Sequence, residues 1–175
     1  MQIINNKIIT NKKIALKQVK KLIWALGDVS EELRADREVV MAAVNLYGLA
    51  LQFASEELRA DREVVMAAVK QNGAAIQFAS DELQDDKELV LTAVNRDGWA
   101  LYYVSYELKV DKEVVMAAVK QKGFALQYTS TRLKNDKDVV MAAVMQNGRA
   151  IEIASKRLQA DLELLAISDR SINNR

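Results

Sequence analysis

The sequence predicts an all-α solenoid, a stack of short helical units, and three observations carry this prediction. A 25-residue period runs through the 175-residue chain without insertions. Half of the residues are hydrophobic and none is proline, so nothing forces a helix to break. A 25-residue unit cannot bury an apolar helix alone, and stacked neighbours must cover it. We therefore expect one repeat array over residues 1–175, with about seven helix-pair units starting at 11, 36, 61, 86, 111, 136 and 161.

The period is defined by residue types that recur at fixed phases. Aspartate opens the units, with asparagine in its place in the first: Asn11, Asp36, Asp61, Asp86, Asp111, Asp136 and Asp161. Glycine recurs in the middle of the units: Gly48, Gly73, Gly98, Gly123 and Gly148. Serine precedes the next aspartate: Ser30, Ser55, Ser80, Ser105, Ser130 and Ser155. This regularity predicts layers of the same structure.

One unit can be followed from residue to residue. Asp61 is a good N-cap for a helix that contains the apolar run 64–69. An all-round apolar helix has to be buried on all sides. We expect Gly73 to end it in the left-handed conformation that glycine adopts easily. A second, shorter helix should follow over residues 75–79, and Ser80 should cap one more tight turn before Asp86.

Both ends of the array depart from the pattern, as capping units do. The glycine phase of the first unit holds Ile23, and a lysine-rich helix is expected from Lys12 to Leu26. Its apolar stripe suits docking on the next unit, although a basic amphipathic helix can also lie on a membrane. The matching phase favours docking. The last unit loses its valines after Asp161.

No apolar run has the length of a signal peptide, which leaves a cytoplasmic or an exported location open.

The residues of one unit also carry a family resemblance. The stretch D-K-E-V-V-M-A-A-V-K-Q-x-G-x-A-L-Q-Y-x-S-x-x-L at 111–133 resembles the tandem repeat of the domain of unknown function 4116 family. The resemblance runs from about Asn11 to Asp161. It implies a tandem helical repeat of the kind found in bacterial and protist proteins. It implies no activity and no catalytic residue.

The composition argues against an enzyme and against a bound cofactor or metal. The chain has no cysteine and no histidine, which removes thiol nucleophiles and the commonest general base and metal ligand. The aspartates of successive layers should lie about 8–10 Å apart, too far for a calcium site with ligands at about 2.3–2.6 Å. The repeated serines have no histidine to activate them. We therefore interpret both series as helix caps and expect no small-molecule substrate.

A series of basic residues raises the alternative of nucleic-acid binding. It contains Lys12, Arg37, Arg62, Lys87, Lys112 and Lys137. From Arg37 onward, each follows an aspartate and precedes an acidic residue, so its long-range field is largely cancelled. Residues 28–102, with 7 basic and 15 acidic side chains, carry a net charge of −8, which would repel a phosphate backbone. Nucleic acid is disfavoured as a partner.

Positions that vary between units are the candidates for function, because the scaffold does not dictate them. In the fourth unit, Trp99 directly follows the glycine, and Tyr102 and Tyr106 lie three and seven residues after Trp99. At this helical spacing the three side chains share one face. We predict that Trp99, Tyr102 and Phe124 are exposed and form one patch. By contrast, four residues of another phase are all aromatic and are expected in the core: Phe53, Phe78, Tyr103 and Tyr128.

These observations predict a non-enzymatic scaffold that binds a protein of unknown identity. The candidate partner-binding residues are Trp99, Tyr102, Tyr106, Phe124 and Leu49. Two alternatives stay open. One is a nucleic-acid-binding solenoid, and the other is a structural repeat domain of a larger, bacterial effector-like protein.

Overall fold

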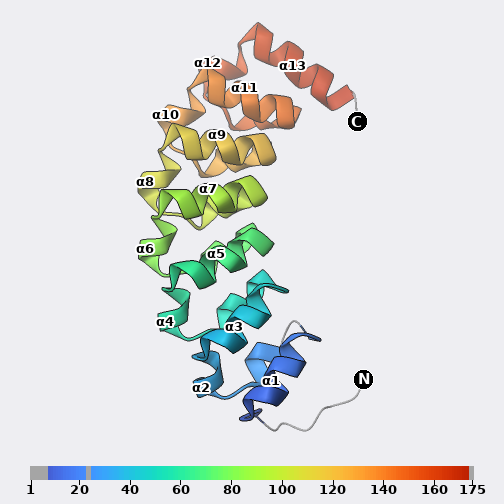
Figure 1. Cartoon of the computed structure of the whole chain (residues 1–175). Helices are drawn as coiled ribbons and strands as arrows, with labels where there is room; N and C mark the ends of the chain where they lie inside the picture. The colour runs from blue at the N-terminus through green and yellow to red at the C-terminus, as the bar shows by residue number, and fades with distance from the viewer. Residues whose placement is uncertain (1–7, 23–24, 174–175) are drawn as a thin grey trace.

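The chain folds into a bowed stack of helical layers, as the 25-residue period predicts (Figure 1). This architecture comes from a computed structural model that describes residues 8–22 and 25–173. Within these ranges the only β pairing is an isolated parallel bridge between Ile9 and Val29. The all-α solenoid is therefore confirmed.

Each complete unit contains three helical segments rather than the expected pair. The long helices are α1 (Lys12–Val19), α3 (Arg37–Val44), α5 (Arg62–Gln71), α7 (Lys87–Arg96), α9 (Lys112–Gln121), α11 (Lys137–Gln146) and α13 (Leu162–Asn173). The segments that follow are 3₁₀ helices: η1 (Ala25–Asp28), η2 (Gly48–Phe53), η3 (Gly73–Phe78), η4 (Gly98–Tyr102), η5 (Gly123–Tyr128) and η6 (Gly148–Ile153). One-turn α-helices complete the units: α2 (Glu31–Arg34), α4 (Glu56–Arg59), α6 (Asp81–Gln84), α8 (Tyr106–Lys109), α10 (Thr131–Lys134) and α12 (Lys156–Gln159).

The long helix of a unit forms where its sequence predicts it. Asp61 Oδ1 accepts hydrogen bonds from the backbone N–H groups of Glu63 (2.9 Å) and Val64 (3.1 Å), so the cap is confirmed. Val64, Val65, Ala68 and Val69 are fully buried between the layers. Met66 and Ala67 are only partly buried, so the helix is covered on most of its circumference rather than on all sides.

The expectation that Gly73 ends the long helix in the left-handed conformation is wrong. No glycine among the described residues has a positive φ, and each repeated glycine begins a 3₁₀ helix. Its requirement is steric: a Cβ built on Gly98 would lie 2.5 Å from the carbonyl oxygen of Ala118 in the next unit. Glycine therefore recurs because the backbones of neighbouring layers approach too closely for any side chain.

The repeated serines join adjacent units as well as capping helices. The backbone N–H of Ser80 donates to the carbonyl oxygen of Arg59 in the preceding unit (3.0 Å), and Ser55 N–H donates equivalently to Arg34 O (3.0 Å). The predicted side-chain cap forms at Ser55, Ser105, Ser130 and Ser155. It is wrong for Ser30 and Ser80, whose side chains make no cap hydrogen bond.

The first unit follows the same plan more closely than expected. The predicted helix from Lys12 to Leu26 ends at Val19, because residues 25–28 occupy the 3₁₀ phase. Ala15 and Val19 are buried, and α1 packs on α3, which supports docking of this helix on the next unit. Ile23 lies outside the described residues. No described helix is long and apolar enough to span a bilayer.

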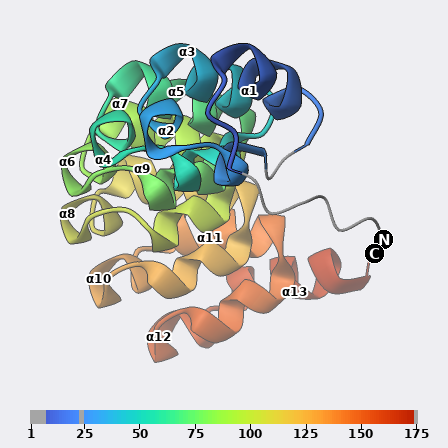
Figure 2. The same cartoon turned by 90° about the horizontal axis from the view of Figure 1, so that it is seen from below.

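The bowed shape gives the array two different edges (Figure 1). The one-turn helices lie along the outer edge, and the turns from each long helix into its 3₁₀ helix lie along the inner edge. Viewed along the stack, the one-turn helices remain on one side while the layers rotate (Figure 2).

Candidate interaction surface

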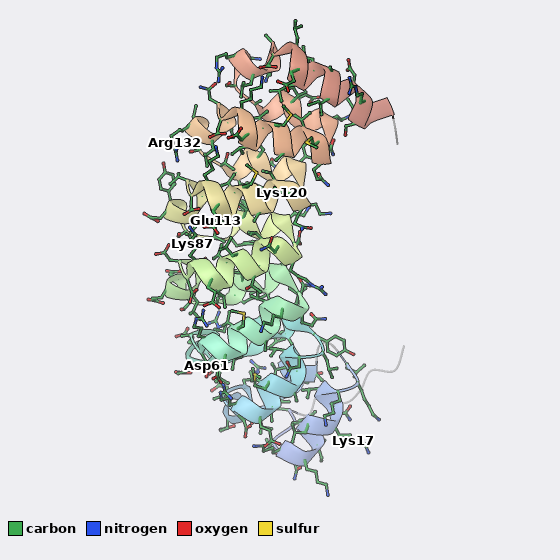
Figure 3. The ribbon with its side chains drawn as sticks, turned by 45° about the horizontal axis from the view of Figure 1, so that its top comes forward. Lys17, Asp61, Lys87, Glu113, Lys120 and Arg132 are labelled. Carbon is green, nitrogen blue, oxygen red and sulfur yellow. The ribbon has the colours of Figure 1, made fainter. Side chains whose placement is uncertain are left out.

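A ladder of ion pairs runs along the outer edge and joins every unit to the next. Lys87 Nζ lies 2.8 Å from Asp111 Oδ2 and 2.8 Å from Glu113 Oε2 of the following unit (Figure 3). The same double bridge recurs at each layer through Lys12, Arg37, Arg62, Lys87, Lys112 and Lys137. The basic series of the sequence is therefore neutralised by carboxylates of the next layer.

Each ladder aspartate serves two units at once. In Asp111, Oδ1 caps α9 while Oδ2 accepts from Lys87 of the unit before. The hydrogen bond from Lys87 and the helix amides lower the pKa of Asp111, and burial opposes them. Conversely, the hydrogen bonds that Lys87 donates to Asp111 and Glu113 raise the pKa of Lys87. These charges have structural partners.

The variable face lies on the 3₁₀ helices and the one-turn helices that follow them. Tyr102 is 55% exposed and Tyr106 is 72% exposed, whereas Trp99 is only 36% exposed. Phe124 and Leu49 are half-buried, and Leu49 packs against the core. The predicted exposure is thus confirmed for Tyr102 and, at a lower fraction, for Trp99, and it is wrong for Phe124.

Four rings pack edge-to-face across the boundary between the fourth and fifth units. The ring centroids of Tyr102 and Tyr128 are 5.0 Å apart, those of Tyr102 and Tyr103 are 5.0 Å apart, and those of Trp99 and Tyr128 are 6.1 Å apart. Lys109 Nζ lies 5.8 Å from the centre of the Tyr102 ring, in range of a cation–π contact. We call Trp99, Tyr102, Tyr103 and Tyr128 the aromatic cluster.

The structure brings together only part of the predicted set. Trp99 and Tyr102 belong to the aromatic cluster. Within the described part of the chain, the cluster forms no ring pair with Tyr106 or Phe124, and Leu49 has no ring to contribute. Tyr106 begins α8 on the outer edge, one element beyond the cluster.

Three residues that contribute to this surface were not predicted from the sequence. Tyr103 and Tyr128 pack partly against the core, as expected for their phase, but their rings also support the two exposed residues. The signal was the 25-residue phase itself, which places Tyr128 one layer above Tyr103. Lys109 ends a one-turn helix, and no pattern in its own unit marks it.

A shallow open hollow of about 340 Å³ adjoins the cluster at the inner edge. Trp99 forms one wall, and the charged residues around it are Arg96, Asp97 and Lys122. Gln71, Asn72 and Gly73 of the third unit complete the lining. Asp97 Oδ1 accepts from the Trp99 N–H at 3.0 Å, which fixes the start of η4.

The described residues contain no group of three or more histidine, cysteine, aspartate or glutamate side chains able to hold a metal ion. The repeated aspartates, which could have suggested such a site, are occupied by helix amides and by lysine or arginine.

The fold and its uniform contacts between layers define a helical repeat protein of the α-solenoid class. The chain matches the family described as Domain of unknown function (DUF4116) over residues 11–59, 61–109 and 111–159, and it belongs to that family. Each matched segment spans two of the 25-residue units. Neither the curated proteins nor the solved structures gave a match to the chain.

Proposed function

We propose that this array is a non-enzymatic scaffold that binds a protein through the aromatic cluster of the fourth and fifth units. One observation carries the proposal: exposed rings occupy positions that the scaffold does not need. In the third unit the phases of Trp99 and Tyr102 hold Ala74 and Gln77, and the unit folds in the same way.

The equivalent glutamine shows what Tyr102 gives up. Gln77 Nε2 donates to the carbonyl oxygen of Ala74 at 3.0 Å, and Gln52 bonds to Leu49 O in the same way at 3.1 Å. Tyr102 replaces this local hydrogen bond with an exposed ring. A substitution that removes a scaffold contact and adds exposed aromatic surface favours an intermolecular role.

Edge-to-face packing also prepares the rings for binding. Tyr102 is held by Tyr103 and Tyr128, so little side-chain freedom remains to be lost when a partner covers it. Tyrosine and tryptophan carry a large share of the binding energy at protein interfaces. The cluster therefore suits a rigid contact with little change of shape.

Nucleic-acid binding, the main alternative, is less well supported. The basic series that suggested it is bridged to carboxylates along the outer edge. The cluster rings cross at 63–84°, whereas binding to a single strand uses aromatic faces on which successive bases stack. The absence of histidine and cysteine from the sequence argues against a catalytic role.

The test is affinity capture from an extract of the organism that makes the chain, followed by binding measurements with the purified partner. Tyr102→Gln reproduces the third unit, and Trp99→Ala reproduces Ala74. We expect each to weaken binding about 30-fold, equivalent to about 2 kcal/mol. Because most of the Trp99 surface is covered, Trp99→Ala should also lower stability, so binding is measured well below the melting temperature.

Tyr106→Ala is the matched control, because Tyr106 is exposed but makes no ring contact with the cluster. It should leave the affinity within about twofold. A partner whose affinity is unchanged by both Tyr102→Gln and Trp99→Ala would exclude the aromatic cluster as its binding site. The partner would then bind another surface of the array.

A further inference from the structure

The fourth and fifth units contain eight cations, of which two, Lys87 and Lys112, belong to the ladder. Lys87 and Lys112 are bridged twice to carboxylates of the next layer. Around the aromatic cluster, no described carboxylate lies within ion-pair distance of the cations on its border. These cations are Arg96, Lys109 and Lys122. Three cations without a carboxylate partner therefore lie beside the cluster, together with the carboxylate of Asp97.

Lys109 differs from its counterparts in the other units. At the same phase, Gln84 Nε2 donates to Gln77 O (3.4 Å) and Lys134 Nζ donates to Gln127 O (2.8 Å). These side chains satisfy carbonyl groups near the ends of the preceding 3₁₀ helices. Lys109 makes no hydrogen bond or ion pair within the described residues, and its ammonium lies over the Tyr102 ring instead.

Within the described residues, the ammonium of Lys109 has no carboxylate partner and lies over the Tyr102 ring. The side chain is half-buried, and this burial lowers the pKa of Lys109 with no described carboxylate to oppose it. A charge that is partly removed from water and left unpaired gains the most from an anion brought by a partner. The ring beneath it offers apolar contact at the same place.

We propose that the segment bound by the aromatic cluster is an acidic peptide. This inference rests on the proposed function and gives the chemistry of the partner. One carboxylate of the segment pairs with Lys109 above the Tyr102 ring. An apolar side chain lies on Trp99 and Tyr102, and a second carboxylate reaches Arg96 and Lys122 at the hollow.

The acids near the site do not replace such a partner. Asp97 lines the hollow, but its Oδ1 is bonded to the Trp99 N–H. Glu107 is exposed in the first turn of α8, beside Tyr106. A nucleic-acid strand would share the negative charge, but a strand that continued over the third unit would meet Asp81, Glu82 and Asp85, whose charges repel phosphate groups.

The experiment selects ligands from an unbiased library of 12-residue peptides displayed on phage, using the whole chain as bait. A variant that carries Trp99→Ala, Tyr102→Gln and Lys109→Gln is used for counter-selection. These substitutions copy Ala74, Gln77 and Gln84, so the variant face already occurs in the fold. We expect enrichment of peptides in which aspartate or glutamate flanks an aromatic or aliphatic residue.

Selected peptides are then synthesised and titrated against single variants. Lys109→Gln should weaken them about tenfold, and replacing their acids by the corresponding amides should cost a similar factor. Lys17→Gln, the same change of charge on α1 at the far end of the array (Figure 3), should leave the affinity within about twofold.

The outcomes separate the two proposals. Peptides that need Trp99 but are neutral or basic would overturn the acidic partner and leave the aromatic cluster as the binding site. A failure to select any peptide that needs Trp99 would overturn both. Tighter binding of a 20-nucleotide single-stranded DNA, lost on Trp99→Ala, would overturn the acidic peptide in favour of a nucleic acid.

Discussion

The third and fourth units share one scaffold and present different faces. Residues 61–85 and 86–110 both begin with an aspartate cap, bury two adjacent aliphatic residues, and start the 3₁₀ helix at a glycine. At the variable positions, however, the third unit has Ala74, Gln77 and Gln84 where the fourth unit has Trp99, Tyr102 and Lys109.

The positions that hold the layers together are therefore separate from the positions that vary on the face. The layers are held by the ladder, the serine amide and the glycine contact, none of which includes the variable phases. A face can therefore change its chemistry while the stack keeps its geometry. Substitutions at scaffold positions should affect both units alike, and those at face positions should affect only the fourth.

The largest loss of stability is expected when alanine replaces either glycine. The Cβ in Gly73→Ala and Gly98→Ala meets the carbonyl oxygen of Ala93 or Ala118, and neither backbone group can rotate away. We expect each variant to lose about 3 kcal/mol in the free energy of unfolding, at the upper end for overpacking. Urea unfolding followed by circular dichroism measures this loss.

Equal losses in the two units would support a shared steric role for the glycine phase. If Gly98→Ala folded with unchanged stability, the layers would have to separate without cost at the inner edge. That result would contradict the close backbone approach described above.

A smaller loss in the free energy of unfolding is expected from substitutions of Asp111, which separate its role as a helix cap from its role in an ion pair. Asp111→Ala removes the helix cap, which contributes about 1 kcal/mol, and an exposed ion pair worth less than about 1 kcal/mol. Asp111→Asn keeps the cap, as Asn11 does with the Ile14 N–H, and removes only the charge. In urea unfolding, Asp111→Ala should lose about 1–2 kcal/mol, and Asp111→Asn at most about half of that.

Should the two substitutions cost the same, the charge rather than the cap would dominate at this position. The ladder would then contribute more than surface ion pairs usually do.

The smallest expected effects come from titration of the ladder. The pKa of Asp86 lies below its ordinary value of 3.8, chiefly through the hydrogen bond from Arg62. The stability it contributes is present above pH 3.8 and is lost as the pH falls through the folded-state pKa. The pKa of Lys87 lies above 10.5, so its contribution is present below that pH and is lost as the pH rises further.

The urea midpoint should therefore be nearly constant between these limits, because the chain has no histidine to titrate there. It should fall at both extremes. Asp111→Asn should show a shallower fall on the acid side than the unchanged chain. A sloping midpoint near neutral pH would show that other groups control stability.

The fold could be predicted from the sequence because the strongest signals are local and repeated. Asp61 caps a helix that begins at the next residue, and Val64 and Val65 mark the buried face. The 3₁₀ segments were not predictable in the same way, since six residues between a glycine and a serine suit either kind of short helix. The role of Gly98 depends on Ala118, and only the packed layers show that contact.

The candidate site was predicted in part for the same reason. Exposure of Tyr102 follows from its variation between units, but its support by Tyr128 depends on how neighbouring layers rotate. The ladder partners are 24 and 26 residues apart, which is one layer in the stack, whereas the acids next to each cation in the sequence are not its partners.

The two edges should also respond differently to bending. Along the inner edge, Gly98 and its counterparts bring backbone against backbone, which leaves no room for further approach. Along the outer edge, the layers are bridged by long lysine and arginine side chains that can lengthen or shorten by rotating about their single bonds. The spacing of the layers is therefore fixed at the inner edge and adjustable at the outer edge. The array should bend by changing the distances between its one-turn helices.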